Sequence, residues 1–209
     1  MPEPGAPASW LALGDSYTIG EGVPEAGRWP NQLAARLNRQ GIAVLSPRIL
    51  ATTGWTTAEL SAAMDEQKPL GQWSLVSLLI GVNDQYRGRS PADYRPAFCD
   101  LLTRAVALAQ GRADRVLVVS IPDWGQTPFA DQQGRDSREI SARIDAFNAV
   151  AREESQRLGC PWVDVTGISR DRGGQPDMLA ADGLHPSAAM YARWAEQAYP
   201  AARAALLTR

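Results

Sequence analysis

The single histidine of this chain, His185, lies three residues after Asp182. An imidazole is the side chain that most readily accepts and returns a proton near neutral pH. A carboxylate three positions earlier, across a turn, can bind one ring nitrogen and leave the other free to act as a base. Alternatively, His185 is structural, as a histidine ahead of a helix often is. The pair makes this segment the first candidate for proton-transfer chemistry.

A serine near the other end of the chain can supply the matching nucleophile. Ser16 lies in the run Gly14-Asp15-Ser16-Tyr17, directly after an apolar stretch. A serine at a turn from strand to helix presents its hydroxyl beside backbone N–H groups that favour negative charge. Alternatively, Ser16 caps a helix together with Asp15. Combined with His185, the serine indicates the chemistry of a serine hydrolase.

Two further turns carry groups that can stabilise an oxyanion. Gly54 lies in a run of threonines around Trp55, and glycine lets the backbone bring an N–H close to a ligand. Asn83 lies in the run Gly81-Val82-Asn83-Asp84, and its side-chain amide can donate a hydrogen bond. Glycine and asparagine are also ordinary turn residues. Asp84 is expected to fix its loop by accepting backbone N–H bonds.

Short apolar runs predict the strands that must position these residues, and amphipathic stretches between them predict helices. The predicted strands are Trp10–Leu13, Ala43–Leu50 (weakened by Pro47), Leu75–Ile80, Val116–Ile121 and Trp162–Val165. The predicted helices are Trp29–Arg39, Thr57–Gln67, Tyr94–Leu108, Ile140–Ala151 and Ala188–Leu206.

The alternation of strands and helices predicts a single α/β domain over residues 1–209, with three layers, α/β/α. In such sheets the ligand crevice lies outside the carboxyl ends of the strands. Ser16, Gly54 and Asn83 each follow a different predicted strand, whereas Asp182 and His185 precede the last predicted helix. The sequence therefore predicts that these five residues meet at one edge of the sheet.

Taken together, four motifs in this order resemble those of the SGNH (GDSL-type) hydrolase family over nearly the whole chain. They are Gly14-Asp15-Ser16, Gly54 in its Thr-Gly-Trp-Thr context, Gly81-Val82-Asn83-Asp84, and Asp182-Gly183-Leu184-His185-Pro186. The GDSL motif that gives the family its name ends in leucine, and in this chain Tyr17 occupies that position. The resemblance implies a flavodoxin-like five-stranded parallel sheet with strand order 2-1-3-4-5.

The resemblance also implies a role for each site residue. Ser16 would be the nucleophile, His185 the base and Asp182 the acid that orients it. The oxyanion would be held by the Ser16 N–H, the Gly54 N–H and the Asn83 amide. The implied activity is hydrolysis of carboxylic esters.

Aromatic residues on the same loops bear on the substrate. Trp55, Tyr86, Trp124 and Phe129 lie there and either line an acyl or aryl pocket or pack the loops down. No long lid interrupts the chain, which favours small, short-acyl or acetyl esters. The alternatives are a thioesterase, lysophospholipase or carbohydrate deacetylase using the same site, or a non-catalytic ligand-binding relative.

Other classes of site and partner are disfavoured by composition. With a net charge of -2 and no basic run, no nucleic-acid partner is expected. One histidine and two isolated cysteines predict no metal site and no cofactor, the alternative being a metal site built from carboxylates alone. The glycine motifs of phosphate- and dinucleotide-binding loops are absent. Lys68, the only lysine, lies far from where a flavodoxin-like phosphoacceptor domain would need it.

Location and assembly are less well defined by the sequence. No apolar stretch approaches the roughly 18 residues that a membrane span needs, so no membrane insertion is expected. The first residues, Met1–Ser9, carry Pro and Glu where a signal peptide would have a basic residue and an apolar run. This predicts a cytoplasmic protein, or a periplasmic one if a leader has been removed. The sequence does not indicate an oligomeric state.

Overall fold

The apolar runs of the chain form the centre of a parallel sheet. In the computed structural model, which describes residues 6–208, β1 (Trp10–Gly14), β3 (Leu75–Leu79) and β4 (Val116–Val119) are buried along their whole length. Strands covered on both faces have this continuously apolar character. All neighbouring strands are parallel and lie in the order β2-β1-β3-β4-β5. The predicted fold class and strand order are confirmed.

The second strand is shorter than predicted. β2 runs over Arg48–Ala51 and begins directly after Pro47, whereas the sequence predicted a strand over Ala43–Leu50. Proline has no N–H to donate to the ladder and is tolerated only at strand ends and edges. Before it, Val44 forms only an isolated bridge to Ala8.

The last two strands also end before the predicted boundary, because side chains take over the backbone hydrogen bonds. β5 is Trp162–Val163. Beyond β4 the Ser120 N–H still donates to the backbone carbonyl oxygen of Val163. The Ile121 N–H donates instead to a side chain, at 2.8 Å from Asn148 Oδ1. The Val165 N–H donates to the Ser120 hydroxyl oxygen at 2.8 Å. The two segments that follow β4 and β5 therefore stay side by side without forming a β-ladder.

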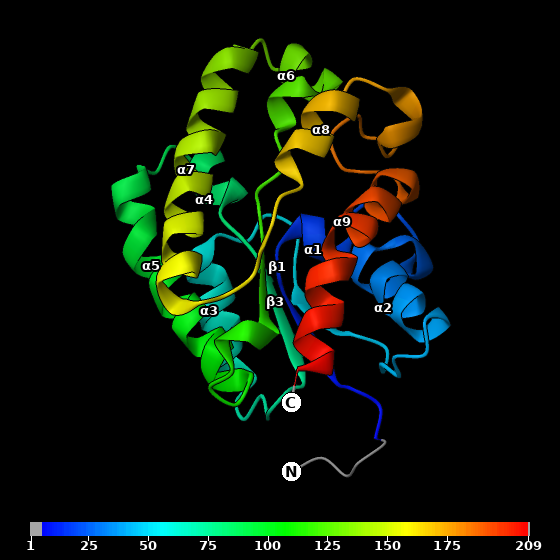
Figure 1. The fold of residues 1–209 in the computed structure, drawn as a ribbon. Helices are drawn as coiled ribbons and strands as arrows, with labels where there is room; N and C mark the ends of the chain where they lie inside the picture. Colours follow the sequence, from blue (N-terminus) through cyan, green and yellow to red (C-terminus); the bar gives the residue numbers. More distant parts are fainter. Residues whose placement is uncertain (1–5, 209) are drawn as a thin grey trace.

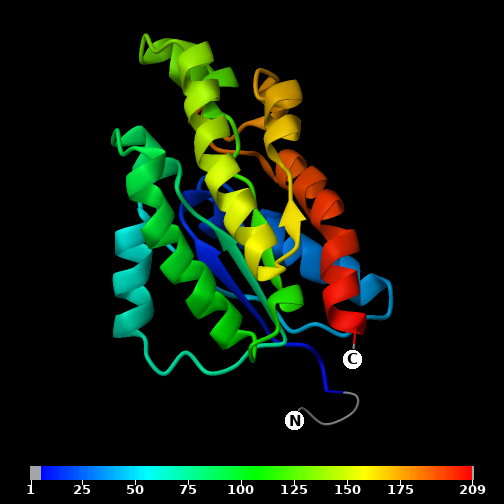
Figure 2. The same ribbon diagram turned by 60° about the vertical axis from the view of Figure 1, so that its left-hand side comes forward.

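Five long helices cover the two faces of the sheet (Figures 1 and 2). On one face lie α3 (Thr57–Glu66), α5 (Pro91–Leu108) and α7 (Ser137–Leu158). On the other lie α2 (Trp29–Arg39) and α9 (Ala188–Leu207). All five predicted helices are confirmed, although α5 and α7 are longer than the apolar periodicity indicated.

Capping residues explain where these helices begin. Thr56 and Glu59 form a capping box at the start of α3, and the side chains of Ser90, Asp136 and Ser187 accept N–H groups at the starts of α5, α7 and α9. Such caps satisfy backbone donors that have no partner within the helix. They fix the ends of the loops that carry the candidate site.

The loops themselves contain short helices that the sequence did not predict, because one or two turns are too short to show a periodic pattern. They are α1 (Ser16–Ile19), α4 (Val82–Tyr86), α6 (Pro128–Gln132), α8 (Thr166–Arg172) and the 3-10 helices η1 (Glu25–Gly27), η2 (Ala113–Arg115), η3 (Trp124–Gln126) and η4 (Pro176–Met178). Two of them, α1 and α4, directly follow β1 and β3.

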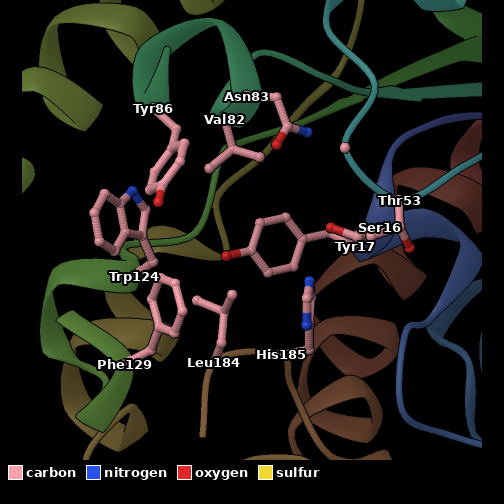
Figure 3. Close-up of a pocket in the computed structure, with 11 residues that line it drawn as sticks. Ser16, Tyr17, Thr53, Val82, Asn83, Tyr86, Trp124, Phe129, Leu184 and His185 are labelled. Carbon is pink, nitrogen blue, oxygen red and sulfur yellow. The ribbon is translucent and has the colours of Figure 1, made fainter. Parts of the chain in front are cut away.

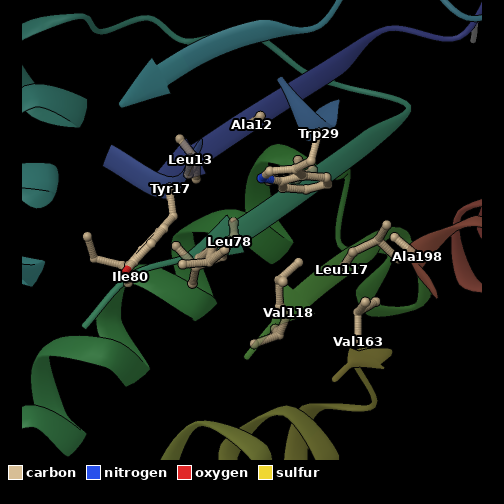
Figure 4. Packing of buried hydrophobic residues seen from close by; sticks show 14 of the residues in the cluster. Ala12, Leu13, Tyr17, Trp29, Leu78, Ile80, Leu117, Val118, Val163 and Ala198 are labelled. Carbon is tan, nitrogen blue, oxygen red and sulfur yellow. The ribbon is translucent and has the colours of Figure 1, made fainter. Parts of the chain in front are cut away.

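The core fills the space between the sheet and the helix layers. On the face covered by α2 and α9, Ala12 and Leu117 from the strands lie beside Trp29 of α2 and Ala198 of α9, and all four are at most 1% exposed (Figure 4). Within residues 6–208, none of the helices is long and apolar enough to cross a membrane. Residues 1–5 of the N-terminal stretch used to predict location lie outside the described part.

Candidate active site

The turn from β1 into α1 holds Ser16 at the edge of the sheet. Asp15 is the N-cap of α1, and its Oδ1 accepts the Tyr17 N–H at 3.0 Å. Ser16 is therefore the first residue of the helix and not its cap. At this position its backbone N–H has no acceptor within the helix and can be offered to a ligand. The alternative that Ser16 serves only as a cap is not supported.

Gly14 allows this close turn. A Cβ on Gly14 would lie 2.2 Å from the Thr18 hydroxyl oxygen and 2.6 Å from the Leu79 carbonyl oxygen. Because the second neighbour is backbone of an adjacent strand, it cannot move aside. Any larger residue would displace α1, and with it Ser16.

The carboxyl group of Asp15 is enclosed beneath the turn. Asp15 is fully buried, and its Oδ2 has no hydrogen-bond partner among the described residues. Burial raises the pKa of Asp15 to about 8, and the nearby charge of Asp84 acts in the same direction. This residue therefore keeps its proton at neutral pH.

Asp182 and His185 form the contact that their spacing predicted. The His185 Nδ1 lies 2.6 Å from Asp182 Oδ2. Asp182 Oδ1 accepts the N–H groups of Leu184 and His185, each at 2.9 Å. Gly183 has a φ of +66°, a left-handed conformation that closes this turn at little cost. The Asp182 side chain thus holds both the backbone of the turn and the ring.

The charge state of Asp182 follows from these contacts. Partial burial raises the pKa of Asp182, but hydrogen bonds from the His185 ring and from two backbone N–H groups outweigh it and leave the pKa below its ordinary value. Asp182 is therefore a carboxylate at neutral pH. A carboxylate in this position favours the ring tautomer with the proton on Nδ1 and leaves Nε2 as an acceptor.

The tertiary structure brings His185 and Ser16 to the same pocket from opposite ends of the chain. Both line a cavity at the carboxyl edge of the sheet, and the His185 ring points toward Ser16 (Figure 3). The Tyr17 ring packs against the imidazole, with the ring centroids 5.6 Å apart. His185 is only 8% exposed, so its ring has little freedom to turn away.

Gly54 and Asn83 line the wall of the same pocket. Gly54 has a φ of +86°, and its N–H makes no hydrogen bond with any residue of the described range 6–208. The Asn83 Nδ2 donates to the Trp55 carbonyl oxygen at 2.8 Å. Since an amide nitrogen carries two hydrogens, one remains available to a ligand.

Polar side chains behind this wall hold the two loops together. The buried Asp84 accepts the Thr57 N–H at 2.9 Å and the Thr57 hydroxyl at 2.7 Å, so it fixes the loop as the sequence indicated. Arg89 donates to Asp84 at 2.8 Å. Arg87 contacts Gly54 and Glu59, a role that the sequence did not indicate.

The far end of the pocket is aromatic. The pocket occupies about 220 Å³, and the predicted residues Tyr86, Trp124 and Phe129 line it. Trp124 lies between the other two rings, with centroids 5.5 Å from Tyr86 and 6.2 Å from Phe129. Trp55 is not part of the lining. Its side chain packs against the core and its carbonyl accepts the Asn83 amide.

Four lining residues were missed by the sequence analysis. They are Tyr17, Thr53, Val82 and Leu184. Each is the immediate neighbour of a predicted residue, and this adjacency was the only available signal. The Thr53 hydroxyl donates to the Glu21 carboxylate and so ties the Gly54 turn to the loop after α1.

A buried carboxylate supports the aromatic end. Asp123, the N-cap of η3, accepts the Gly125 N–H at 2.9 Å, the Ser141 hydroxyl at 2.6 Å and Arg170 Nε at 2.9 Å. These bonds connect the Trp124 segment to α7 and α8. Among residues 6–208, no group of three or more His, Cys, Asp or Glu side chains is placed to hold a metal ion.

Comparisons with known proteins identify the family of this chain. Residues 12–193 match the model of the GDSL-like lipase/acylhydrolase family. Esterase TesA of Pseudomonas aeruginosa is 29% identical, over 91% of this chain and 85% of its own. An arylesterase of Vibrio mimicus is 26% identical, over 84% of this chain and 78% of its own.

Solved structures share the fold. The psychrotrophic esterase EstA from Pseudoalteromonas sp. superimposes with a TM-score of 0.73 at 15% identity, covering 96% of this chain and 100% of that one. At this identity the likeness concerns the fold alone, and the family match carries the assignment. The chain therefore belongs to the GDSL-like lipase/acylhydrolase family and, as a member of it, is a GDSL esterase.

Proposed function

We propose that this chain hydrolyses small, short-acyl carboxylic esters through an acyl-enzyme formed on Ser16. One observation carries the proposal. Ser16 lines the same pocket as His185, whose Nδ1 lies 2.6 Å from the Asp182 carboxylate. This combination of a nucleophile, a base and an orienting acid is the one that ester hydrolysis by serine requires.

In the proposed reaction, His185 Nε2 takes the hydroxyl proton as Ser16 Oγ attacks the ester carbonyl carbon. The tetrahedral intermediate collapses when the bond to the alcohol oxygen breaks, and His185 returns the proton to that oxygen. Water then repeats the sequence on the acyl-enzyme and releases the acid. Asp182 stabilises the imidazolium that forms in each half.

The negative charge on the carbonyl oxygen would be held by three donors. They are the Ser16 N–H, the Gly54 N–H and the second N–H of the Asn83 amide. Donors that are fixed before the reaction stabilise a developing charge without reorganisation during the step. The hydrogen bond from Asn83 to Trp55 supports this role, because it fixes the plane of the amide.

The size and lining of the pocket support the preference for short acyl groups. Its volume of about 220 Å³ is below the 300–1,000 Å³ that drug-sized ligands occupy. Apolar and aromatic side chains line most of it, so a short aliphatic or aromatic group would be desolvated there. The Vibrio mimicus relative is named an arylesterase, which suits an aromatic lining.

The proposal is tested with p-nitrophenyl esters from acetyl to dodecanoyl, assayed with the wild type and with Ser16→Ala. We expect turnover to be highest for acyl chains of two to four carbons and to be lost in Ser16→Ala. A fluorophosphonate probe should label the wild type and not the variant. Turnover that persists in Ser16→Ala would exclude the acyl-enzyme, and a maximum at eight carbons or more would exclude the short-acyl preference.

A further inference from the structure

A second cavity lies beyond the aromatic end of the site. It occupies about 390 Å³ and is formed by the α6–α7 connection, the first two turns of α7 and Gln85 of α4. Its lining residues are Gln85, Gly134, Arg135, Asp136, Glu139, Ile140 and Arg143. We refer to it as the outer cavity. Two of its lining residues, Gln85 and Arg135, contact the aromatic rings of the substrate pocket. The outer cavity and the pocket are therefore separated by one layer of side chains.

Arg135 covers that layer from the outer side. Its guanidinium carbon lies 4.9 Å from the centroid of the Tyr86 ring and 5.6 Å from that of Trp124. Within the described part of the chain, its side chain forms neither a hydrogen bond nor an ion pair with another residue. The two rings are thus the groups that hold this guanidinium, and a cation over an aromatic face is attracted by the ring quadrupole.

The two rings differ in how firmly they are held. Trp124 is 2% exposed, and its Nε1 donates to Gln85 Oε1 at 3.0 Å. Tyr86 is 41% exposed, and its hydroxyl bonds to no residue in the range 6–208. The Tyr86 ring is held by its contacts with the Trp124 ring and with the Arg135 guanidinium (Figure 3 shows the two rings). Tyr86 is therefore the part of the wall that can move.

We propose that Arg135 is a specificity-determining residue, which limits acyl-chain length by holding Tyr86 against Trp124 and so closing the pocket toward the outer cavity. The inference rests on the proposed ester hydrolysis at Ser16 and adds to it the element that sets the length limit. Arg135 does not touch the reacting atoms and acts through Tyr86.

The planar shape of the guanidinium matters to this role. A guanidinium can lie over two neighbouring rings at once, whereas the ammonium group of lysine is a compact, strongly hydrated charge. Arg135→Ala should free Tyr86 and join the pocket to the outer cavity. Arg135→Lys should retain part of the closure.

The experiment measures kcat/KM for p-nitrophenyl butyrate and octanoate. Since each additional buried methylene contributes about fourfold to binding, admitting two more carbons should raise the octanoate-to-butyrate ratio about tenfold or more in Arg135→Ala. We expect Arg135→Lys to give an intermediate ratio. Arg138, exposed on α7 and without a side-chain hydrogen bond or ion pair to another described residue, supplies the matched control. Arg138→Ala should leave the ratio unchanged.

The outcomes separate this inference from the function on which it rests. If Ser16→Ala abolishes turnover but Arg135→Ala keeps the wild-type ratio, the role of Arg135 is wrong and the proposed function stands. The role is also wrong if Arg138→Ala shifts the ratio as much as Arg135→Ala does. If Ser16→Ala retains turnover, both the proposed function and this inference fail.

Discussion

Arg87 Nη2 donates a hydrogen bond to the carbonyl oxygen of Gly54 at 2.8 Å. The same guanidinium pairs with Glu59 on α3 at 3.2 Å. Arg87 directly follows α4, whereas Gly54 lies in the turn after β2. The bond to the carbonyl fixes the Gly54–Trp55 peptide, which directly follows the peptide that carries the Gly54 N–H, relative to the loop that carries Asn83. The two loops that supply the proposed oxyanion donors are therefore joined by one arginine.

Arg87→Ala should lower kcat by about 10- to 100-fold, because a small misplacement of a catalytic group has effects of this size. KM should change less, since Arg87 does not line the pocket. Steady-state kinetics on p-nitrophenyl acetate would measure both parameters. Arg152, exposed on α7 and without a side-chain hydrogen bond or ion pair to another described residue, is the control. Equal kcat values for Arg87→Ala and Arg152→Ala would contradict the positioning role.

Asn83→Ala should lower kcat by roughly 10²–10³, the cost of losing one oxyanion donor. The loss should fall on kcat, because the donor acts mainly on the charge that develops in the transition state. Gln197→Ala, at an exposed amide on α9, should be neutral. Thermal unfolding followed by circular dichroism checks that both variants fold. An unchanged kcat in a folded Asn83→Ala protein would remove this amide from the mechanism.

Asp182→Asn should lower kcat by roughly 10²–10⁴, because an amide nitrogen facing His185 Nδ1 favours the wrong ring tautomer. The substitution keeps an oxygen that can accept the Leu184 and His185 N–H groups, so the turn should persist. Asp177→Asn, five residues earlier and exposed, controls for the general loss of a negative charge. If single-turnover acylation of Asp182→Asn matches that of the wild type, Asp182 does not orient the base.

Asp15 predicts a pH dependence of stability. Its pKa is raised from 3.8 to about 8, so between these values the native state holds a proton that the unfolded chain has lost. The free energy of unfolding should therefore fall as pH rises through this window, with a slope of up to about 1.4 kcal/mol per pH unit from this one group. Asp15→Asn should lack this contribution, because asparagine does not titrate.

Urea unfolding at pH 5, 6.5 and 8 measures the effect as the difference between the wild type and Asp15→Asn. We expect Asp15→Asn to become more stable relative to the wild type as pH rises. Asp171→Asn, at an exposed position on α8, should follow the wild type at each pH. A constant difference between Asp15→Asn and the wild type across the three pH values would show that Asp15 does not titrate in this range.

Local patterns were reliable where the residues that stabilise an element are close in sequence. α2 begins and ends where predicted, since its apolar face and its proline in the first turn are both local signals. The contact between Asp182 and His185 was likewise predicted from a spacing of three residues. The second strand was predicted too long, because an apolar stretch around Pro47 does not show where ladder pairing begins.

The aromatic residues show the limit of such reasoning. Trp55 and Trp124 both follow predicted strands, and nothing in the sequence distinguishes them. In the structure Trp124 lines the pocket and Trp55 does not. The difference depends on partners far along the chain, namely Gln85 for the Trp124 ring and Asn83 for the Trp55 carbonyl.

The order of motifs, the alternation of strands and helices and the three-residue spacing of the acid and the imidazole were determined by the chain itself, because each depends on neighbours within a few positions. The packing of Tyr17 against the His185 ring, the hydrogen bond from Arg87 to Gly54 and the stacking of Arg135 on Tyr86 were decided only by the tertiary structure. These contacts join side chains whose distances depend on how the helices pack on the sheet. No local pattern encodes that packing.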